Sequence, residues 1–224
     1  MALKLFVQSL RLALLGLLLF LPAGTLAWPQ AWAFLAIFIG CSVGIGVWLL
    51  KTDTDLLAER MKSPLGLDQK AEDRTVMVVL AIGFLAWFVF MALDARRFGW
   101  SHTRPWAQVL GALLIVAAFY GWFLVLRANR FAATTVRLQQ ERGQTVISTG
   151  PYAVVRHPMY SYALLLMIGA PLLLGSLWGL VWLLLFVPLL GLRALGEEVM
   201  LMNGLPGYRD YATKVRYRLL PGIW

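Results

Sequence analysis

The sequence has little charge and almost no cysteine. Charged residues make up 14% of the 224 residues, whereas a soluble domain has about 25%. The single cysteine, Cys41, lies inside an apolar run, which excludes a disulfide-stapled secreted scaffold and a zinc cluster. Apolar residues make up 60% of the chain and include 10 tryptophans, a composition that excludes a disordered chain. Composition therefore predicts an integral membrane protein that crosses the bilayer several times.

Four stretches nearly free of charge are each long enough for one membrane helix, which needs about 20 residues. They cover residues 12–28, 31–50, 76–93 and 106–126. The first also resembles a secretory signal, because small residues from Ala23 to Ala27 follow its leucines. The turn at Trp28-Pro29 leads directly into the second stretch, as in a helical hairpin, so we predict four transmembrane helices.

A fifth apolar stretch, residues 161–191, is too long for one membrane helix. Its 31 residues carry no charge. As a straight helix it would measure about 46 Å, against a hydrocarbon core of about 30 Å. Its middle contains residues that kink or break helices, namely Gly169, Pro171, Gly175, Ser176 and Gly179. We therefore predict two arms folded back as a hairpin.

The formal net charge of +9 would suit nucleic acid, but in a membrane protein basic residues mark the cytoplasmic side. With the amino terminus inside and the hairpin in place, 17 of the 20 Lys and Arg lie inside, leaving Arg96, Arg97 and Arg104 outside. A single crossing over 161–191 would change the split to 12 and 8. We therefore predict cytoplasmic termini, a bacterial inner-membrane location and no nucleic-acid partner.

These observations together predict the fold class. We expect an all-α integral membrane protein with four transmembrane helices plus a C-terminal helical hairpin at 158–196, which makes five or six membrane helices in all. The G-x-G at Gly44 to Gly46 follows no predicted strand, so no Rossmann domain is expected. Residues 1–126 are predicted to be scaffold, and residues 127–224 to be the cofactor-binding and catalytic region.

Residues 150–160, GPYAVVRHPMY, concentrate polar and aromatic side chains at one mouth of the hairpin. Proline is favoured in the first turn of a helix, and the residue before it is extended. Pro158 is therefore predicted to begin the first arm and to turn His157 away from it. At the other mouth, Arg193 and Glu197 are four residues apart and share a helix face. The hairpin brings the two mouths together.

Each of these residues also has an ordinary interpretation. Arg156 can extend to the lipid headgroups, and the tyrosines can be interfacial aromatics. Arg193 and Glu197 can form a helix salt bridge. Their joint occurrence at a membrane boundary, where polar groups are costly, favours a site. The loop 51–74, by contrast, mixes acidic and basic residues and is predicted to be a solvated connector.

Three stretches resemble the isoprenylcysteine carboxyl methyltransferase family and its relatives among phospholipid N-methyltransferases. They are QTVISTGPYAVVRHPMY at 144–160, RALGEEVML at 193–201 and GYRDYATKVRYRLLPGIW at 207–224. The pairing of R-H-P-x-Y with E-E is the more specific part. The resemblance covers the chain from Thr145 onward, whereas residues 1–126 match only in being membrane spans.

The resemblance implies a cytoplasm-facing pocket for S-adenosylmethionine without a Rossmann domain. Carried over position by position, the residues implied to line the adenosyl group are Gln144, Thr145, Val146 and Ile147. Those implied around the ribose and methionine parts are Tyr152, His157, Pro158, Met159 and Tyr160. Glu197 is implied to bind the cofactor, and Arg193 to meet the methyl acceptor. Glu198 is implied to support them.

The chemistry of the residues agrees with this implication. S-adenosylmethionine carries a sulfonium, an ammonium and a carboxylate, and Glu197, the Arg156-His157 pair and the two tyrosines supply suitable partners. Methyl transfer is an in-line displacement that needs alignment and exclusion of water, so no metal is required. Arg193 can hold a carboxylate acceptor. An amine acceptor needs a base, and His157 and Glu198 are the candidates.

We therefore expect a methyltransferase with Arg193, His157 and Glu198 as catalytic residues. Its acceptor would be a lipophilic molecule among the membrane lipids: a prenylcysteine carboxylate, a phospholipid amine or another isoprenoid. Two other interpretations stay open. One is a membrane reductase of the sterol-reductase type with a nicotinamide cofactor, and the other is a transporter or assembly subunit whose charged mouth is structural.

Overall fold

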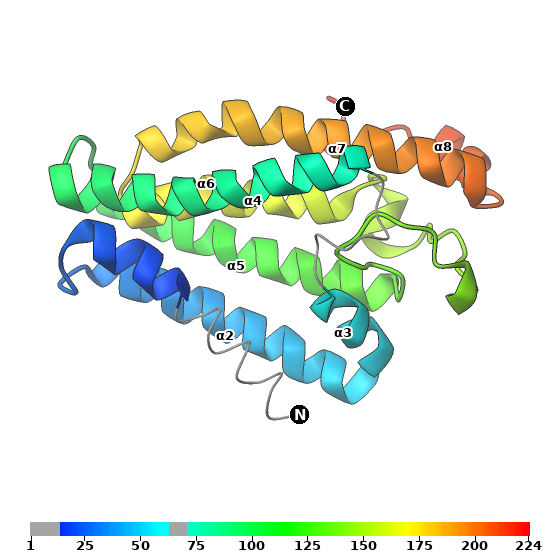
Figure 1. Ribbon diagram of the computed structural model, residues 1–224, viewed down its shortest axis with the longest axis horizontal. Coiled ribbons are helices and arrows are strands. Elements are labelled where there is room, and N and C mark those ends of the chain that lie inside the picture. Colours follow the sequence, from blue (N-terminus) through cyan, green and yellow to red (C-terminus); the bar gives the residue numbers. More distant parts are fainter. Residues whose placement is uncertain (1–13, 63–70) are drawn as a thin grey trace. The chain divides into compact units, whose positions relative to one another are not determined.

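The computed structural model describes residues 14–62 and 71–224, and every regular element in these residues is a helix (Figure 1). Four helices are long and apolar enough to cross a membrane: Pro29–Thr52, Asp73–Phe98, Pro105–Ala128 and Trp178–Gly204. Two shorter apolar helices accompany them, Leu14–Ala23 and Pro158–Leu174. The all-helical membrane class predicted from the sequence is confirmed.

The elements that follow Leu14–Ala23 fall into long and short helices. The α-helices are α2 (Pro29–Thr52), α3 (Thr54–Met61), α4 (Ala71–Ala92), α5 (Pro105–Ala128), α6 (Pro158–Leu174), α7 (Leu183–Gly204) and α8 (Tyr208–Lys214). One π-helical turn, η1 (Leu93–Phe98), continues α4. Three 3-10 helices are η2 (Gln140–Arg142), η3 (Gly150–Ala153) and η4 (Trp178–Trp182).

Prolines begin three of the long helices. Pro29 starts α2, Pro105 starts α5 and Pro158 starts α6, because a fixed φ and a missing N–H suit the first helical turn. The predicted spans after Pro29 all lie inside helices of the structure. The predicted first span, 12–28, is described only from Leu14, and that helix ends at Ala23.

The long apolar stretch is divided into two helical arms, as predicted, and the break falls at Gly175. Gly175 has a φ of 93°, in the left-handed region that glycine adopts at no steric cost. The 3-10 helix η4 then leads into α7. Pro171 lies inside α6, and Pro188 lies inside α7. Of the five residues that could break the helix, Gly175 therefore ends the first arm.

The chain divides into two compact units, each built from three separate stretches. The first takes the described residues up to Val43 together with Ala81–Val116 and Leu165–Leu185. In this unit the backbones of α5 and α6 approach closely. A Cβ added at Gly111 would lie 2.6 Å from the carbonyl oxygen of Gly169, and one added at Gly169 would lie 2.7 Å from that of Gly111.

A buried carboxylate ties the turns of the first unit together. Asp94 in η1 is fully buried, and its Oδ2 accepts hydrogen bonds of 2.6 Å from the hydroxyls of Ser101 and Ser176. Those hydroxyls in turn accept the backbone N–H groups of Leu177 and Gly179. The carboxylate thus fixes the turn between α6 and α7 against the end of α4.

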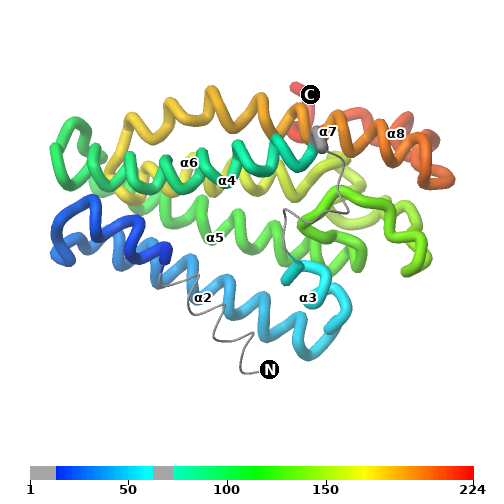
Figure 2. Tube along the Cα trace, viewed as in Figure 1, coloured from blue at the N-terminus to red at the C-terminus, as the bar shows by residue number. Residues whose placement is uncertain are grey.

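The second unit consists of Gly44–Leu80, Ala117–Leu164 and Phe186–Trp224. One of its apolar clusters centres on residues of α2, α3 and α5, namely Leu49, Leu56, Val125, Leu126 and Ala132. Another joins Leu205, Tyr208 and Tyr211 near α8. The tube in Figure 2 follows α7 into α8 in the same unit. Every residue of the candidate site belongs to this unit.

The segment 51–74 is more ordered than the predicted solvated connector. Asp53 caps α3 with its side chain. Glu59 is buried and pairs with Lys62, and its Oε2 accepts a 3.0 Å hydrogen bond from Arg137. The bond from Lys62, followed by that from Arg137, holds the pKa of Glu59 below its usual value against the opposing effect of burial. The prediction is therefore wrong for this part of the segment, because its charges are paired within the fold.

Candidate active site

Two adjacent carboxylates of α7 meet one histidine. The His157 ring Nε2 lies 3.2 Å from Glu198 Oε1, and its Nδ1 lies 3.6 Å from Glu197 Oε2. Burial opposes protonation of His157, but the two carboxylates outweigh it and raise its pKa above the usual value. A neutral ring would turn one unprotonated nitrogen toward a carboxylate, so this geometry favours the imidazolium.

Glu197 is the more accessible of the two carboxylates. Its side chain is 28% exposed, and its Oε2 accepts a 2.9 Å hydrogen bond from the Tyr160 hydroxyl. The rings of Tyr160 and His157 stack with an interplanar angle of 10°. Both contacts of Glu197 use Oε2, which leaves Oε1 without a hydrogen bond to the described residues.

Glu198 is buried among three cationic groups. Besides His157, its Oε1 lies 3.2 Å from Arg156 Nε, and its Oε2 accepts a 3.0 Å hydrogen bond from Arg218. The residue is 2% exposed. Arg156 is also buried, so the interpretation of this arginine as one that extends to lipid headgroups is wrong. Glu198 holds the cations in place, and its catalytic role stays a prediction.

The segment after α8 fixes the residues that precede α6. The backbone N–H groups of Arg156 and His157 donate 2.9 Å hydrogen bonds to the carbonyls of Tyr217 and Arg218. The Ser161 hydroxyl donates to the carbonyl of Leu219. These N–H groups are free to bond outward because the chain before Pro158 is not yet helical. The predicted turning of His157 at Pro158 fits this arrangement.

Arg193 is held by a neighbour in α4. Its Nε donates a 3.1 Å hydrogen bond to Asp73 Oδ1, and its Nη2 donates a 2.8 Å bond to the carbonyl of Thr134. The guanidinium centre lies 5.8 Å from the centroid of the Tyr160 ring. Arg193 therefore pairs with Asp73 rather than with Glu197, which contradicts the ordinary i,i+4 salt bridge. Its Nη1 is left without a partner among the described residues.

The four residues predicted to line an adenosyl group lie on different faces of one segment. Thr145 and Ile147 line a cavity at the ends of α2 and α5, while Val146 packs against the apolar cluster at α8. Gln144 accepts the backbone N–H of Gln139 with its side-chain oxygen. Side chains of an extended segment alternate between two faces, so the structure separates residues that the resemblance places together.

The remaining predicted residues pack around the beginning of α6. The Tyr152 hydroxyl accepts a 2.8 Å hydrogen bond from Asn129, and burial raises the pKa of Tyr152, which keeps the phenol neutral. Met159 and Tyr152 both contact the apolar cluster around Leu126. Pro158 is buried as the first residue of α6. Tyr152 is thus a packed residue of the second unit rather than an interfacial aromatic.

Two buried polar groups near the carboxylates have no hydrogen-bond partner among the described residues. They are the Nε of Arg156, which lies at ion-pair distance from Glu198 without a hydrogen bond, and the hydroxyl of Tyr208. Burial raises the pKa of the Tyr208 hydroxyl, and the negative charges of Glu198 and Glu197 raise it further. Buried donors are rarely left unpaired. Arg156 Nε already faces the Glu198 carboxylate, so the Tyr208 hydroxyl is the group that suits an anionic group of a ligand.

Sequence reasoning missed several residues of this site. Asp73, Tyr208 and Arg218 all contribute, and none was assigned a role. Tyr208 and Arg218 lie inside the quoted C-terminal stretch, but nothing in their spacing singles them out. The only sequence signal for the pairing of Asp73 with Arg193 is their opposite charge. Because 120 residues separate the two, the sequence does not show that they meet.

Comparison with known families finds the phospholipid methyltransferase family, whose model matches residues 106–204. The match runs from the first turn of α5 to the last residue of α7. It therefore includes His157, Tyr160, Arg193 and both carboxylates. No curated protein matches the chain. The match supports the predicted resemblance to phospholipid N-methyltransferases over 145–204 and suggests a membrane methyltransferase. It begins earlier than the predicted resemblance, within α5, and does not include the stretch 207–224. Kinship to the isoprenylcysteine carboxyl methyltransferases stays a prediction.

Proposed function

We propose that this protein transfers a methyl group from S-adenosylmethionine to a lipophilic acceptor in the membrane. The observation that carries the proposal is the cluster of His157, Tyr160 and Glu197, which lies inside the region that matches a methyltransferase family. In the proposed orientation the cofactor reaches this cluster from the cytoplasm, and the acceptor reaches it from the bilayer. The expected setting is a bacterial inner membrane.

The residues present fit this cofactor. When bound, S-adenosylmethionine supplies a methyl group on a positively charged sulfur. Glu197 Oε1 has no partner among the described residues and would bind the ammonium or lie near the sulfonium. The Tyr208 hydroxyl is buried without a hydrogen-bond partner among the described residues and would donate to the carboxylate. Tyr160 holds Glu197 in place through its hydroxyl, and His157 beside it is buried.

Arg193 would orient the acceptor. Asp73, Thr134 and the Tyr160 ring fix its guanidinium, and its Nη1 stays available for a hydrogen bond to the substrate. Arginine binds carboxylates as a planar donor, so a carboxylate acceptor fits this group directly. Such alignment is the main contribution that an enzyme makes to a displacement at an activated carbon.

The two acceptor classes predict different pH profiles. An amine has to lose a proton, and His157 accepts one only above its raised pKa, so the rate would increase toward alkaline pH. A carboxylate acceptor is already ionised at neutral pH, so its rate would not depend on a base. The pH profile of the rate therefore separates amine from carboxylate methylation.

The proposal is tested by isothermal titration of the purified protein in detergent with S-adenosylmethionine and with its demethylated product. We expect saturable binding that weakens at least about tenfold in Glu197→Gln, because one charge-assisted interaction is lost. The matched control is Glu141→Gln, which removes an exposed carboxylate paired with Arg137. An absence of saturable binding, or equal affinity in Glu197→Gln, would overturn the proposal.

The acceptor itself is found by transfer of a labelled methyl group. Membranes that contain the protein are incubated with methyl-labelled cofactor, and the total lipid extract is separated to identify the labelled species. We expect one labelled lipid class that disappears in Arg193→Gln. Competition with a nicotinamide cofactor tests the reductase alternative, which predicts that the nicotinamide displaces the methyl donor.

A further inference from the structure

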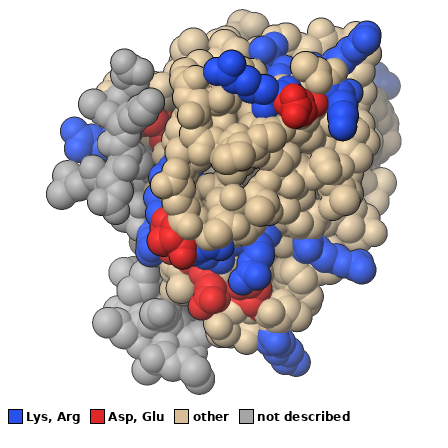
Figure 3. Space-filling model, turned by 90° about the vertical axis from the view of Figure 1, so that its right-hand side faces the viewer, with Lys and Arg blue, Asp and Glu red and all other residues tan. Residues whose placement is uncertain are grey.

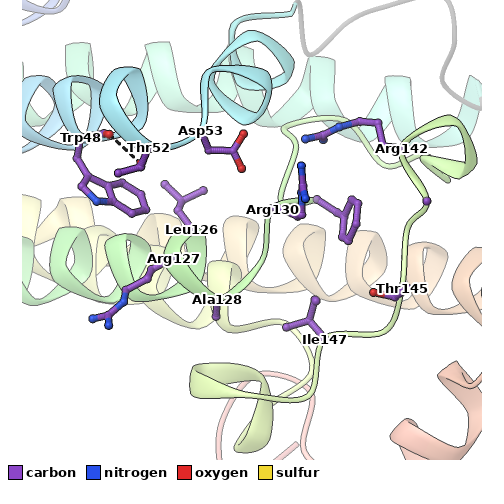
Figure 4. A pocket seen from close by; sticks show the side chains of 12 residues that line it. Trp48, Thr52, Asp53, Leu126, Arg127, Ala128, Arg130, Arg142, Thr145 and Ile147 are labelled. Carbon is purple, nitrogen blue, oxygen red and sulfur yellow. Dashed lines mark hydrogen bonds between the residues drawn. The ribbon is translucent and has the colours of Figure 1, made fainter.

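A cavity of about 500 Å³ lies in the second unit where α2 and α5 end. Its wall is formed by the last turns of these two helices and by parts of the segment 130–147 (Figure 4). The lining contains three arginines, Arg127, Arg130 and Arg142, and one acidic residue, Asp53. The side chains around this cavity therefore carry a net positive charge.

The positive charge is not neutralised by ion pairs. Arg127 and Arg130 take part in no ion pair or side-chain hydrogen bond among the described residues. Arg142 donates a hydrogen bond to Gln139 through Nη1, and its Nη2 is buried without a partner in the described part of the chain. In Figure 4 the Arg142 side chain points toward Arg130. One oxygen of Asp53, Oδ1, accepts the backbone N–H of Leu56 as the cap of α3.

The cavity also has apolar walls and lies at the ends of two membrane spans. Thr52 and Ala128 are the last residues of these spans, and both line the cavity. Lipid headgroups lie at such span ends. Trp48 and Phe131 add aromatic surface to the lining, and tryptophan is enriched at this level of the bilayer. Figure 3 shows Lys and Arg atoms in several separate places on the face that it draws.

We propose that this cavity binds the phosphate group of an anionic membrane lipid that carries no methyl-accepting amine. Arginines bind phosphate oxygens through paired N–H groups, and basic pockets at the ends of membrane helices suit lipid phosphates. An amine-bearing headgroup would add a further cation to a lining that already has three arginines against one acidic residue. The lipid is therefore a bound ligand and not the methyl acceptor.

The lipid would touch the segment that the resemblance assigns to the cofactor. Thr145 and Ile147 line the same cavity as the three arginines. A headgroup bound by the arginines would lie beside this segment and hold it in place. The binding itself does not depend on the proposed methyl transfer, so it is measured without any cofactor or acceptor.

Native mass spectrometry of the protein in detergent, titrated with phosphatidylglycerol, tests the proposal. We expect saturable binding of the lipid that weakens about tenfold in Arg130→Gln, the loss that corresponds to one charge-assisted hydrogen bond. Arg127→Gln serves as a second variant. The matched control is Lys51→Gln, which removes one positive charge at the end of α2 outside the lining. Unchanged unfolding temperatures show that the variants fold.

Two further ligands distinguish a lipid headgroup from a free anion and from a zwitterionic lipid. Inorganic phosphate in excess is expected to leave phosphatidylglycerol bound, and phosphatidylcholine is expected to bind more weakly. Displacement of the lipid by inorganic phosphate would overturn the lipid assignment and identify a site for free phosphate. Equal binding of phosphatidylcholine, or an equal loss in Lys51→Gln and Arg130→Gln, would overturn the proposal.

Discussion

Glu197 and Glu198 are neighbours in the sequence, yet they have opposite surroundings. Successive residues of a helix point about 100° apart, so one carboxylate is partly exposed while the other is buried among Arg156, His157 and Arg218. A buried carboxylate with several cations contributes mainly to the structure, and a carboxylate with a free oxygen is available to a ligand. The two residues therefore predict different consequences of the same substitution.

Glu198→Gln is expected to destabilise the protein by about 3–5 kcal/mol, because it leaves buried cations without their counter-charge. Glu197→Gln is expected to cost less stability, since its carboxylate is partly exposed. Thermal unfolding of both variants in the same detergent measures the difference. A larger loss in Glu197→Gln than in Glu198→Gln would contradict the assignment of Glu198 to structure.

The stability that His157 contributes is expected to decrease as the pH rises. The folded protein binds its proton more tightly than the unfolded chain does, because the pKa of His157 is raised. The contribution is therefore fully present below the unfolded pKa of about 6.5 and is lost as the pH rises through the folded pKa.

The measurement is the difference in unfolding temperature between the protein and His157→Gln from about pH 5 to about pH 9. This difference is expected to shrink toward alkaline pH. The matched control is His102→Gln, which changes an exposed histidine outside the candidate site. A difference for His157→Gln that grows with pH would show that the imidazolium is not the stabilised form.

The sequence predicts the residues of the cluster better than their contacts. The joint occurrence of His157, Tyr160 and Glu197 at the two mouths of a hairpin was visible in the residue pattern, and the structure joins them. The partners Asp73 and Arg218 were not visible, because a charged residue in a loop or a tail has many possible partners. Which partner each of these charged residues contacts is known only from the folded structure.

The boundaries of the helices are also predicted only in part by the sequence. Prolines at the beginnings of helices and the excess length of 161–191 predicted the boundaries and the hairpin. Five small or proline residues competed for the position of the break, and the structure selects Gly175. The charged segment 51–74 was misjudged, because mixed charge is equally typical of a solvated loop and of residues such as Glu59 that pair with a neighbouring element.

The close contact of α5 with α6 makes a prediction at the element scale. Gly169→Ala is expected to destabilise the first unit by about 1–3 kcal/mol, because the added methyl group meets the backbone of Gly111. The matched control is Gly40→Ala in α2, where no atom of the described residues lies within 4 Å of the added Cβ. Alanine is expected to be neutral or stabilising there, since it favours helix.

Unfolding of both glycine variants in detergent measures the two effects under the same conditions. A loss at Gly40 as large as that at Gly169 would show that glycine is required for reasons other than helix contact. Small residues at such contacts let membrane helices approach each other closely, so we expect the loss at Gly169 alone.

The distribution of Lys and Arg along the sequence predicts how the whole molecule is oriented in the membrane. The apolar helices are compatible with an integral membrane protein, and the inner excess of basic residues is a prediction from the sequence. The single cysteine makes the orientation measurable. Replacing Cys41 by alanine gives a cysteine-free background, in which new cysteines report the side of the membrane on which they lie.

In that background, Arg104→Cys is expected to react with an impermeant maleimide added to intact spheroplasts. Asn203→Cys is expected to react only after the membrane is permeabilised. Both positions are exposed in the structure, so a difference in labelling reports the membrane side rather than burial. Reversed labelling would contradict cytoplasmic termini and would place the candidate site outside the cell.

The docking of residues 217–219 against the residues before α6 has a consequence for biosynthesis. A chain that emerges from the ribosome releases α6 and α7 before the segment that binds them. Until then Arg156 and His157 lack their backbone acceptors, and Glu198 lacks Arg218. A nascent chain that stalls after α8 would thus insert all its spans without completing the site. Translation of the tail is therefore the step that completes the contacts of the candidate site.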